Sequence, residues 1–259
     1  MTVALHSNIS EGKKKQVEHM FNRIAFRYDL LNQLLSFGIH NVWRKRAIRL
    51  LKSPARAGTE RSGGQIRIPI AIGTKSQILD VATGTGDFAI DALKLNPEKI
   101  TGIDISEDML AFGRKKIERK NLSGTIELLK ADAEDLPFPD NHFDAATVGF
   151  GVRNFENLEK GLSEISRTLK KDGTLAVLEF SIPEKFPMKQ LYNFYLKNIC
   201  PLIGRMISKD PVAYTYLFTS VSAFPYGEKF RNILLGCGFS KADVFPQTFG
   251  IVTIYIAKK

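Results

Sequence analysis

The sequence predicts an α/β fold in which a mostly parallel sheet of seven strands carries an antiparallel hairpin at its C-terminal end. Between residues 77 and 180, short apolar runs alternate with amphipathic segments. A glycine-rich turn follows the first run directly, which is typical of a strand that passes into a helix. Two later apolar runs, 242–245 and 251–257, are separated by a short turn and therefore predict the hairpin.

The segment 77–180 contains the strands and helices of the predicted doubly wound core. Strands are expected at 78–82, 100–105, 125–130, 143–150 and 173–180. Helices are expected after the first strand to about residue 95, from Ser106 onward, and over 158–169. Glu107 and Asp108 follow Ser106, as the positive end of a helix dipole favours. This rhythm implies parallel strands covered by helices on both faces.

The flanking segments complete a single domain of residues 1–259. Residues 11–52 are expected to form N-terminal helices, the second over 40–51, and 52–76 reads as a loop insertion rich in Gly, Pro, Ser and Arg. The aromatic-rich insert 181–230 is interpreted either as a lid over the ligand crevice or as ordinary core. Residues 231–259 supply a C-terminal helix and the hairpin.

Composition excludes several classes of protein. The 259 residues are 44% hydrophobic and 25% charged, close to the average for globular proteins. No apolar run is long enough for a membrane span, and the N-terminus lacks the apolar region of a secretory signal. Cys200 and Cys237 belong to no metal-binding pattern, so we expect no metal site. The simplest location is the cytoplasm.

Positive charge is concentrated near the N-terminus. The net charge is +10, and the residues up to Lys52 hold ten basic and three acidic side chains. Such a surplus suits RNA, DNA or an anionic membrane surface, and it equally suits a solvated face of a basic protein. Charge alone leaves these interpretations open.

The turn after the first strand, DVATGTGD at 80–87, predicts a nucleotide-binding site. Gly84 and Gly86 can adopt dihedrals barred to other residues, so a ligand can approach the backbone closely. The helix that follows offers free N–H groups. Asp104 ends the second strand, where a carboxylate can accept hydrogen bonds from both hydroxyls of a ribose.

Three features favour S-adenosylmethionine (SAM) over a nicotinamide cofactor, although the glycine pattern alone fits both. Asp80 and Asp87 bracket the glycines with negative charge, which opposes a pyrophosphate and suits an ammonium and a sulfonium. The acidic run ADAEDLPF begins after the third strand, where an adenine amino group could be read. The C-terminal hairpin is typical of class I SAM-dependent methyltransferases. The predicted fold class is therefore that Rossmann-like fold.

Four motifs resemble those of the ubiquinone/menaquinone biosynthesis C-methyltransferases. They are YDLLNQLLSFGIHNVW at 28–43, LPFPD at 136–140, FGVRN at 150–154, and RTLKKDGTLAVLEFS at 167–181. Leu31 replaces the family's usual Met, and Lys171-Asp172 stands where Pro-Gly is common. The resemblance covers nearly the whole chain outside 52–76 and is much more specific than the glycine turn.

The resemblance implies which residues contact the cofactor. With the turn, the set is Asp80, Gly84, Thr85, Gly86, Asp104, Asp132, Ala133 and Gly149. The family often has Asn at the position of Asp132, and either side chain can accept a hydrogen bond from adenine. It often has Ser at the position of Gly149. Because glycine has no hydroxyl group, any contact at this position in the present chain comes from the backbone.

The implied reaction is methyl transfer to a ring carbon of a polyprenylated quinol, most simply demethylmenaquinol. Such a transfer needs a base or an oxyanion stabiliser, and His40, Asp210 and Arg153 are the expected catalytic residues, with Asn154 as a further candidate. His40 and Arg153 are expected to face the quinol. Each also has an ordinary structural interpretation. His40 would form a hydrogen bond between a helix and a loop, Asp210 would cap a helix, and Arg153 with Asn154 would stabilise a turn.

The isoprenoid tail of such a substrate implies transient contact with a membrane surface, as for a peripheral protein at the inner face of the plasma membrane. The basic N-terminal segment could dock on anionic lipid, and the aromatic insert could receive the tail. A nicotinamide-dependent oxidoreductase and an RNA-directed methyltransferase are the alternatives, although the sequence shows no clear hydride-transfer acid and no base-methylation motif. No nucleic-acid partner is expected, and a homodimer is one candidate state. The choice between menaquinone and ubiquinone precursors stays open.

Overall fold

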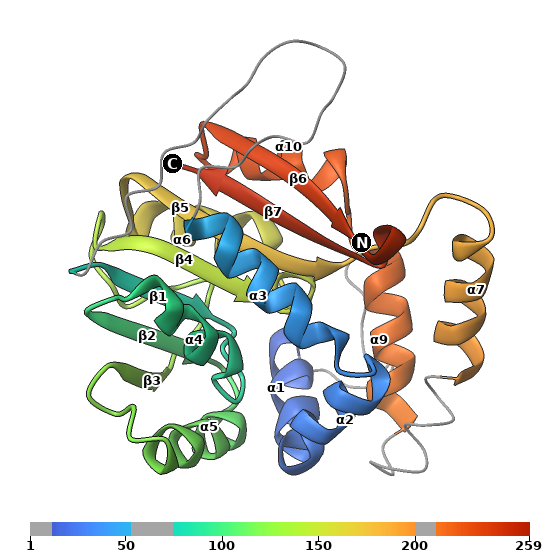
Figure 1. Ribbon diagram of the computed structural model, residues 1–259, viewed down its shortest axis with the longest axis horizontal. Helices are drawn as coiled ribbons and strands as arrows, with labels where there is room; N and C mark the ends of the chain where they lie inside the picture. Colours follow the sequence, from blue (N-terminus) through green and yellow to red (C-terminus); the bar gives the residue numbers. More distant parts are fainter. Residues whose placement is uncertain (1–11, 53–74, 200–210) are drawn as a thin grey trace.

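The computed structural model describes residues 12–52, 75–199 and 211–259. Seven strands form one sheet in the order β3-β2-β1-β4-β5-β7-β6 (Figure 1). The strands are β1 (Gln77–Val81), β2 (Lys99–Asp104), β3 (Ile126–Lys130), β4 (Phe143–Gly149), β5 (Leu169–Phe180), β6 (Lys241–Gln247) and β7 (Val252–Lys258). The first five run parallel, and β7 is antiparallel to both β5 and β6. The predicted fold class is confirmed.

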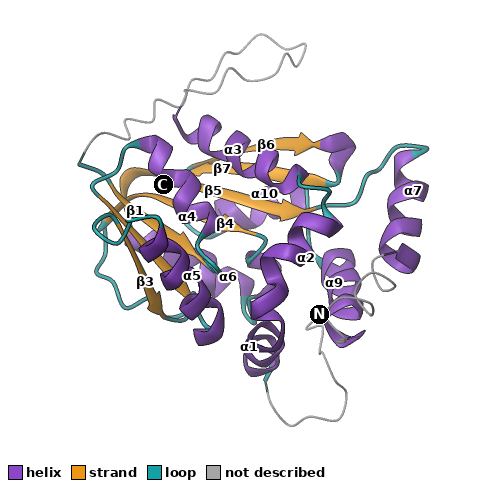
Figure 2. Cartoon of the chain, turned by 60° about the horizontal axis from the view of Figure 1, so that its bottom comes forward, coloured by secondary structure: helices purple, strands orange, loops and turns teal. Residues whose placement is uncertain are grey.

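Helices cover both faces of the sheet because alternate strand side chains are apolar on both sides. One face packs on α3 (Ile39–Lys52), α4 (Asp87–Ala92) and α5 (Glu107–Arg119), with Ile78 and Ile254 in the shared core. The other packs on α6 (Leu158–Thr168) and α10 (Glu228–Gly236), with Leu79 and Tyr255. Figures 1 and 2 show these two helical layers.

Helix ends follow local sequence signals. The Ser106 hydroxyl accepts a hydrogen bond from the Met109 N–H at 3.2 Å, which caps α5. The Asn157 side chain does the same for the Lys160 N–H at 3.0 Å and caps α6. One strand boundary differs from expectation: β5 begins at Leu169, four residues before the expected 173, and its register against β4 shifts between Phe143 and Ala145.

The N-terminal segment forms three helices rather than the two that were expected. Helix α1 (Lys13–Ile24) ends in a 3₁₀ turn, Ala25–Arg27, and α2 (Tyr28–Leu35) then leads to α3. The turn between α2 and α3 contains Phe37 and Gly38, both with positive φ. Apolar side chains of α1 and α2 pack together with Tyr216 of α9 (Pro211–Ala223). These helices lie at the carboxyl ends of the parallel strands (Figure 1).

The described part of the insert after β5 is mainly helical. It contains α7 (Met188–Phe194), which continues as a π-helical turn over Tyr195–Ile199, and then α9. The Tyr195 hydroxyl donates to the backbone oxygen of Leu35 at 2.6 Å, so the insert contacts the end of α2. Most of the expected insertion 52–76, at 53–74, lies outside the described residues, as does Cys200. None of the described helices combines the length and apolarity needed to cross a membrane.

Candidate active site

The glycine turn is held from below by Asp80. Its fully buried carboxylate accepts hydrogen bonds from the hydroxyls of Thr83 and Thr147, each at 2.6 Å. Burial raises the pKa of Asp80 from 3.8 to about 6. In the turn itself, Gly84 and Gly86 adopt the left-handed conformation, with φ of 56° and 80°. Asp80 lines neither cavity described below, and in this structure it contacts the turn through Thr83.

Asp104 and Thr85 are also tied into the protein. The two carboxylate oxygens of Asp104 accept hydrogen bonds from the N–H groups of Gly84 and Ser106, at 2.8 and 2.9 Å. Each oxygen keeps a further lone pair, and burial raises the pKa of this carboxyl group. The Thr85 hydroxyl donates to Asp29 of α2 at 2.6 Å. The motif at 28–43 is thereby joined directly to the glycine turn.

The negative charge of Asp87 is compensated, which contradicts the expectation that it remains available to a cationic ligand. Asp87 forms ion pairs with Lys116 at 2.8 Å and Arg44 at 3.3 Å, and Lys116 also pairs with Asp29 at 2.6 Å. Asp80, the other flanking acid, is buried with a raised pKa. Asp87 still lines the large cavity described below, while the acidic residues that line the small one are Asp104, Asp132, Glu134 and Glu156.

A small cavity of about 70 Å³ lies between the carboxyl ends of β1, β2 and β4 and helix α1. Asp104, Asp132, Ala133 and Gly149 line it, as do Gly84 of the turn and Val17 and Phe21 of α1. Asp132 forms an ion pair with Lys14 of α1 at 2.5 Å and accepts a hydrogen bond from the Glu134 N–H at 2.9 Å. Most residues predicted from the cofactor motifs therefore meet in one place.

The structure explains the glycine at position 149. A Cβ atom placed there would lie 2.8 Å from Cδ1 of Phe88, which is closer than side chains tolerate. Phe88 is itself buried in the core beneath the turn. A residue with a side chain at Gly149 would therefore have to displace this ring.

A second, larger cavity of about 380 Å³ adjoins the first. The two share wall residues, namely Phe21, Tyr28, Ala82, Gly84, Gly149 and Phe150. Its walls are mainly apolar and come from α1, α2, α3, the glycine turn, β4 and the insert. The insert residues are Met188, Leu191, Tyr192, Tyr195, Tyr216 and Leu217. Two ligands that fill the two cavities would meet at the shared wall.

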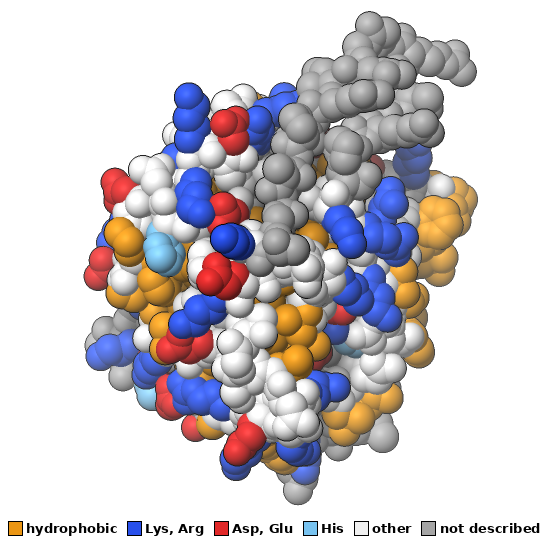
Figure 3. Space-filling view, turned by 60° about the vertical axis from the view of Figure 1, so that its left-hand side comes forward, with side chains coloured by type: hydrophobic (Ala, Val, Ile, Leu, Met, Phe, Trp, Pro, Cys, Tyr) orange, Lys and Arg blue, Asp and Glu red, His pale blue; other side chains and the backbone are white. Residues whose placement is uncertain are grey.

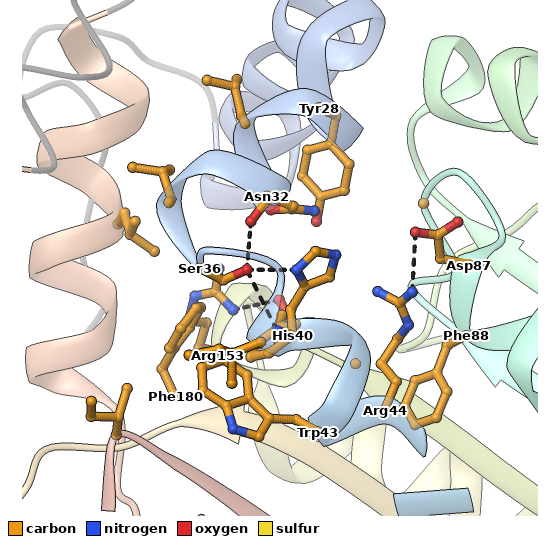
Figure 4. A pocket seen from close by; sticks show the side chains of 18 of the residues that line it. Tyr28, Asn32, Ser36, His40, Trp43, Arg44, Asp87, Phe88, Arg153 and Phe180 are labelled. Atoms are coloured by element: carbon orange, nitrogen blue, oxygen red, sulfur yellow. Dashed lines mark hydrogen bonds and ion pairs between the residues drawn. The ribbon is translucent and has the colours of Figure 1, made fainter. Parts of the chain in front are cut away.

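His40 lies on the wall of the large cavity and is held in one orientation (Figure 4). Its Nδ1 lies 2.5 Å from the Ser36 hydroxyl, which lies 2.6 Å from the backbone oxygen of Asn32. Because the single hydroxyl proton is donated to Asn32, Ser36 must accept a proton from Nδ1, and Nε2 then keeps its lone pair. Burial, assisted by the charge of Arg44, lowers the pKa of His40 below 6.5. The imidazole is therefore neutral at neutral pH.

Arg153 also lines the large cavity, in a buried ion pair. Its Nη1 contacts Glu179 at 2.7 Å and donates to the backbone oxygen of Phe150. The guanidinium carbon lies 5.3 Å from the ring centre of Phe180. The Glu179 carboxylate is fully buried, and burial raises its pKa. The Nε of Arg153 is buried without a hydrogen-bond partner. His40 and Arg153 thus face one cavity, whereas Asp210 lies outside the described residues.

Several residues of this site were not predicted. Glu179 and Ser36 lay within quoted motifs, but neither was assigned a role. Tyr28 lines both cavities, and burial raises the pKa of its hydroxyl. Asn154, by contrast, was a further catalytic candidate from the sequence; it accepts a hydrogen bond from the Tyr216 hydroxyl at 3.1 Å and lines the small cavity rather than the large one. A buried-strand pattern with one acid, as in LAVLEF, was the available signal for Glu179.

The chain is similar to known methyltransferases over nearly its whole length. The sequence profile of the ubiE/COQ5 methyltransferase family matches residues 9–259. A demethylmenaquinone methyltransferase of Bacteroides fragilis is 47% identical over 252 residues, which cover 96% of this chain and 95% of that protein. A ubiquinone/menaquinone biosynthesis C-methyltransferase UbiE of Geotalea daltonii is 38% identical over 249 residues, 95% of this chain and 97% of that protein.

Solved structures share the fold. A SAM-dependent methyltransferase of Thermotoga maritima superimposes with a TM-score of 0.58 at 20% identity, over 93% of this chain and 99% of that one. One of Methanococcus maripaludis, titled as putative, gives a TM-score of 0.56 at 17% identity, over 98% and 97% of the two chains.

Proposed function

The chain belongs to the ubiE/COQ5 methyltransferase family, and from that premise we propose that it methylates a ring carbon of a polyprenylated quinol, with SAM as methyl donor. Demethylmenaquinol is the proposed acceptor, since relatives of up to 47% identity bear the name demethylmenaquinone methyltransferase. The observation that carries the proposal is a large apolar cavity with His40 and Arg153 on its wall, adjoining a small polar one. Neither the oxidoreductase nor the RNA-directed alternative is supported by the family match.

The residues around the small cavity fit the adenosyl part of SAM. Asp104 retains lone pairs for ribose hydroxyls, and Asp132 with Ala133 lies where an adenine edge can be read. Gly84 and Gly149 allow close approach to the backbone. When bound, SAM supplies an electrophilic methyl group on a positively charged sulfur. No metal is required for transfer from such a leaving group.

The residues of the large cavity fit the quinol. We assign His40 Nε2 as the base that takes a proton from a ring hydroxyl, because its lone pair is available and its lowered pKa keeps it neutral. The resulting phenolate directs electron density to the neighbouring ring carbon. Arg153 stabilises the negative oxygen, with Glu179 holding the guanidinium in place. The methyl group would leave the sulfur as a neutral thioether and bond to this carbon. The carbon would then give its own proton to water, which restores the aromatic ring, and His40 would return its proton to the ring oxygen.

The experiment uses purified protein with SAM and demethylmenaquinol reduced in the assay. Wild type should form menaquinol, and His40→Gln should lower kcat about a hundredfold or more, the usual scale for a lost general base. Cells that lack the protein should accumulate demethylmenaquinone by mass spectrometry. No methylated product from the purified wild type, together with no accumulation of demethylmenaquinone in cells that lack the protein, would refute the proposed substrate. Full activity of both His40→Gln and Arg153→Gln would refute the assigned roles.

Contact with a membrane surface follows from the apolar tail of the proposed substrate. The basic N-terminal segment was the expected docking surface, but part of its charge is used within the protein. Lys14 pairs with Asp132, Lys13 donates to the backbone oxygen of Arg153 at 3.1 Å, and Arg44 pairs with two acids. Apolar contacts therefore have to contribute more to docking than the sequence suggested. Binding to anionic vesicles that weakens only partly with salt is the expected result.

A further inference from the structure

Exposed apolar side chains lie on three segments that also contribute to the wall of the large cavity. In the described part of the chain, every large exposed apolar side chain except Phe112 lies on 26–42, on 186–194 or on the turn Thr248–Gly250. We call this set the apolar rim. It consists of Phe26, Leu30, Leu34, Phe37, Ile39, Val42, Phe186, Leu191, Phe194 and Phe249. Figure 3 shows hydrophobic side chains along one edge of the molecule, with Lys and Arg side chains beside them.

The three segments of the rim are joined to one another. The Tyr195 hydroxyl donates to the backbone oxygen of Leu35 at 2.6 Å, which connects the insert to α2. The indole N–H of Trp43 donates to the Thr248 hydroxyl at 2.8 Å, which connects α3 to the turn between β6 and β7. The rim is therefore one surface carried by a fixed framework.

The rim is continuous with the large cavity. Phe37, Ile39 and Leu191 are exposed and also line that cavity, and Thr248 and Ile251 line it on either side of the turn that carries Phe249. An apolar chain attached to a ligand in the cavity can pass to the rim without crossing a polar surface. A cavity of about 380 Å³ can hold the ring of a quinol, whereas a long prenyl tail must extend beyond it.

Two rim residues are costly in an isolated protein. Phe37 and Phe249 are each 78% exposed, and each has positive φ, at 50° and 58°. A bulky side chain at positive φ is an outlier, since Asn or Gly adopts this conformation much more easily. Strain of this kind at an exposed aromatic points to a function for the side chain.

Charge around the rim favours an anionic surface. Residues 184–199 contain Lys185, Lys189 and Lys197 against one acidic residue, Glu184. On α2 the acid Asp29 is paired with Lys116. Apolar side chains beside lysines suit the boundary between lipid headgroups and acyl chains.

From these observations we propose that the apolar rim inserts into the surface of an anionic lipid bilayer and that the large cavity opens there, so that a prenylated quinol enters from the membrane without passing through water. The part about quinol entry rests on the proposed function. The docking surface itself rests on the exposure, strain and charge of the rim.

The test uses the full-length protein with Phe37→Asn and Phe249→Asn combined. Asn tolerates positive φ, so this variant should unfold at the same temperature as wild type or a higher one. Phe112→Asn, on the exposed side of α5, is the matched control. Co-sedimentation with vesicles of equal phosphatidylglycerol and phosphatidylcholine is expected to weaken at least tenfold for the double variant, as loss of two phenylalanines from an apolar contact predicts. The control should bind like wild type.

Turnover separates this proposal from the proposed function. With demethylmenaquinol in vesicles, the single variant Phe249→Asn should lose activity about as much as it loses binding. Because Phe249 lines neither cavity, this variant should convert a tail-less quinol in buffer at the wild-type rate. Weakened vesicle binding without methylation of either quinol would leave the docking surface established and refute the substrate. Unchanged vesicle binding would overturn the docking surface. A further outcome is that the wild type forms a homodimer in sedimentation, the double variant does not, and neither protein binds vesicles. That result would assign the rim to a second copy of the chain and would also overturn the docking surface.

Discussion

Replacing Ser36 with alanine tests the arrangement that sets the protonation of His40. The Ser36 hydroxyl lies between two acceptor positions, 2.6 Å from the backbone oxygen of Asn32 and 2.5 Å from Nδ1 of His40. Its one proton goes to the backbone oxygen, and the histidine must therefore carry its proton on Nδ1. Alanine at position 36 removes that constraint without adding bulk, so both neutral tautomers become accessible.

The size of the effect follows from the one hydrogen bond that is lost. A typical net hydrogen bond is worth about 0.5–1.5 kcal/mol, which corresponds to a roughly 2- to 13-fold change in an equilibrium constant. If only the tautomer with a free Nε2 lone pair acts as base, kcat with the quinol falls by about this factor for Ser36→Ala. Ser36→Thr, which retains a hydroxyl, should recover most of the activity. The KM for SAM should stay the same, because Ser36 does not line the small cavity.

The assay combines turnover with spectroscopy. The pH profile of kcat should keep its acid limb below pH 6.5, since burial still lowers the pKa of His40. Nitrogen NMR of protein labelled in histidine should show Nδ1 protonated in wild type and a mixture of tautomers in Ser36→Ala. Wild-type kcat in Ser36→Ala, or the same tautomer in both proteins, would refute the reasoning.

Three further predictions concern stability. Burial raises the pKa of Asp80 from 3.8 to about 6. The protonated carboxyl group therefore contributes to the free energy of unfolding fully below pH 3.8, and this contribution is lost as the pH rises through about 6. The free energy of unfolding of wild type should fall by about 3 kcal/mol across this range because of Asp80, and that fall should be absent in Asp80→Asn, as measured by urea unfolding. Glu179→Gln leaves Arg153 buried without its counter-charge and should cost about 3–5 kcal/mol by the same measurement. Gly149→Ser should cost about 1–3 kcal/mol because its Cβ meets Phe88 at 2.8 Å, and Phe88→Leu should reduce that cost.

Each stability prediction has an outcome that contradicts it. An identical pH dependence in wild type and Asp80→Asn would show that the carboxyl group does not titrate abnormally. Glu228→Gln breaks a more exposed ion pair with Arg231 and should lower the free energy of unfolding by less than about 1 kcal/mol. Equal losses for Glu228→Gln and Glu179→Gln would contradict the prediction that burial makes the Glu179 pair more important for stability. Additive effects of Gly149→Ser and Phe88→Leu would exclude a direct clash.

The fold could be predicted because its signals are local. Strands buried on both faces read as apolar runs, and the glycine turn marks the end of β1 whatever lies around it. The break at Ala25–Arg27 could not be predicted, since the apolar spacing continues through it. The early start of β5 depends on a register shift against β4, which is a property of two paired strands rather than of one.

The candidate site was predictable in its residues but less so in its electrostatics. Asp104, Asp132 and Gly149 were expected together, and they line one cavity. The charge assigned to Asp87 was misjudged because its partners, Lys116 and Arg44, come from other helices. Sequence spacing shows which residues share a helix face, but it does not show which charges meet when separate elements pack.

Helix α1 lines the small cavity with Val17 and Phe21 and is fastened to the far wall by the Lys14–Asp132 pair. Any contact between α1 and a ligand in that cavity exists only while the helix is docked. Ligand binding and helix docking therefore strengthen each other by the same free energy. Amide hydrogen exchange along α1 should consequently slow when the cofactor binds.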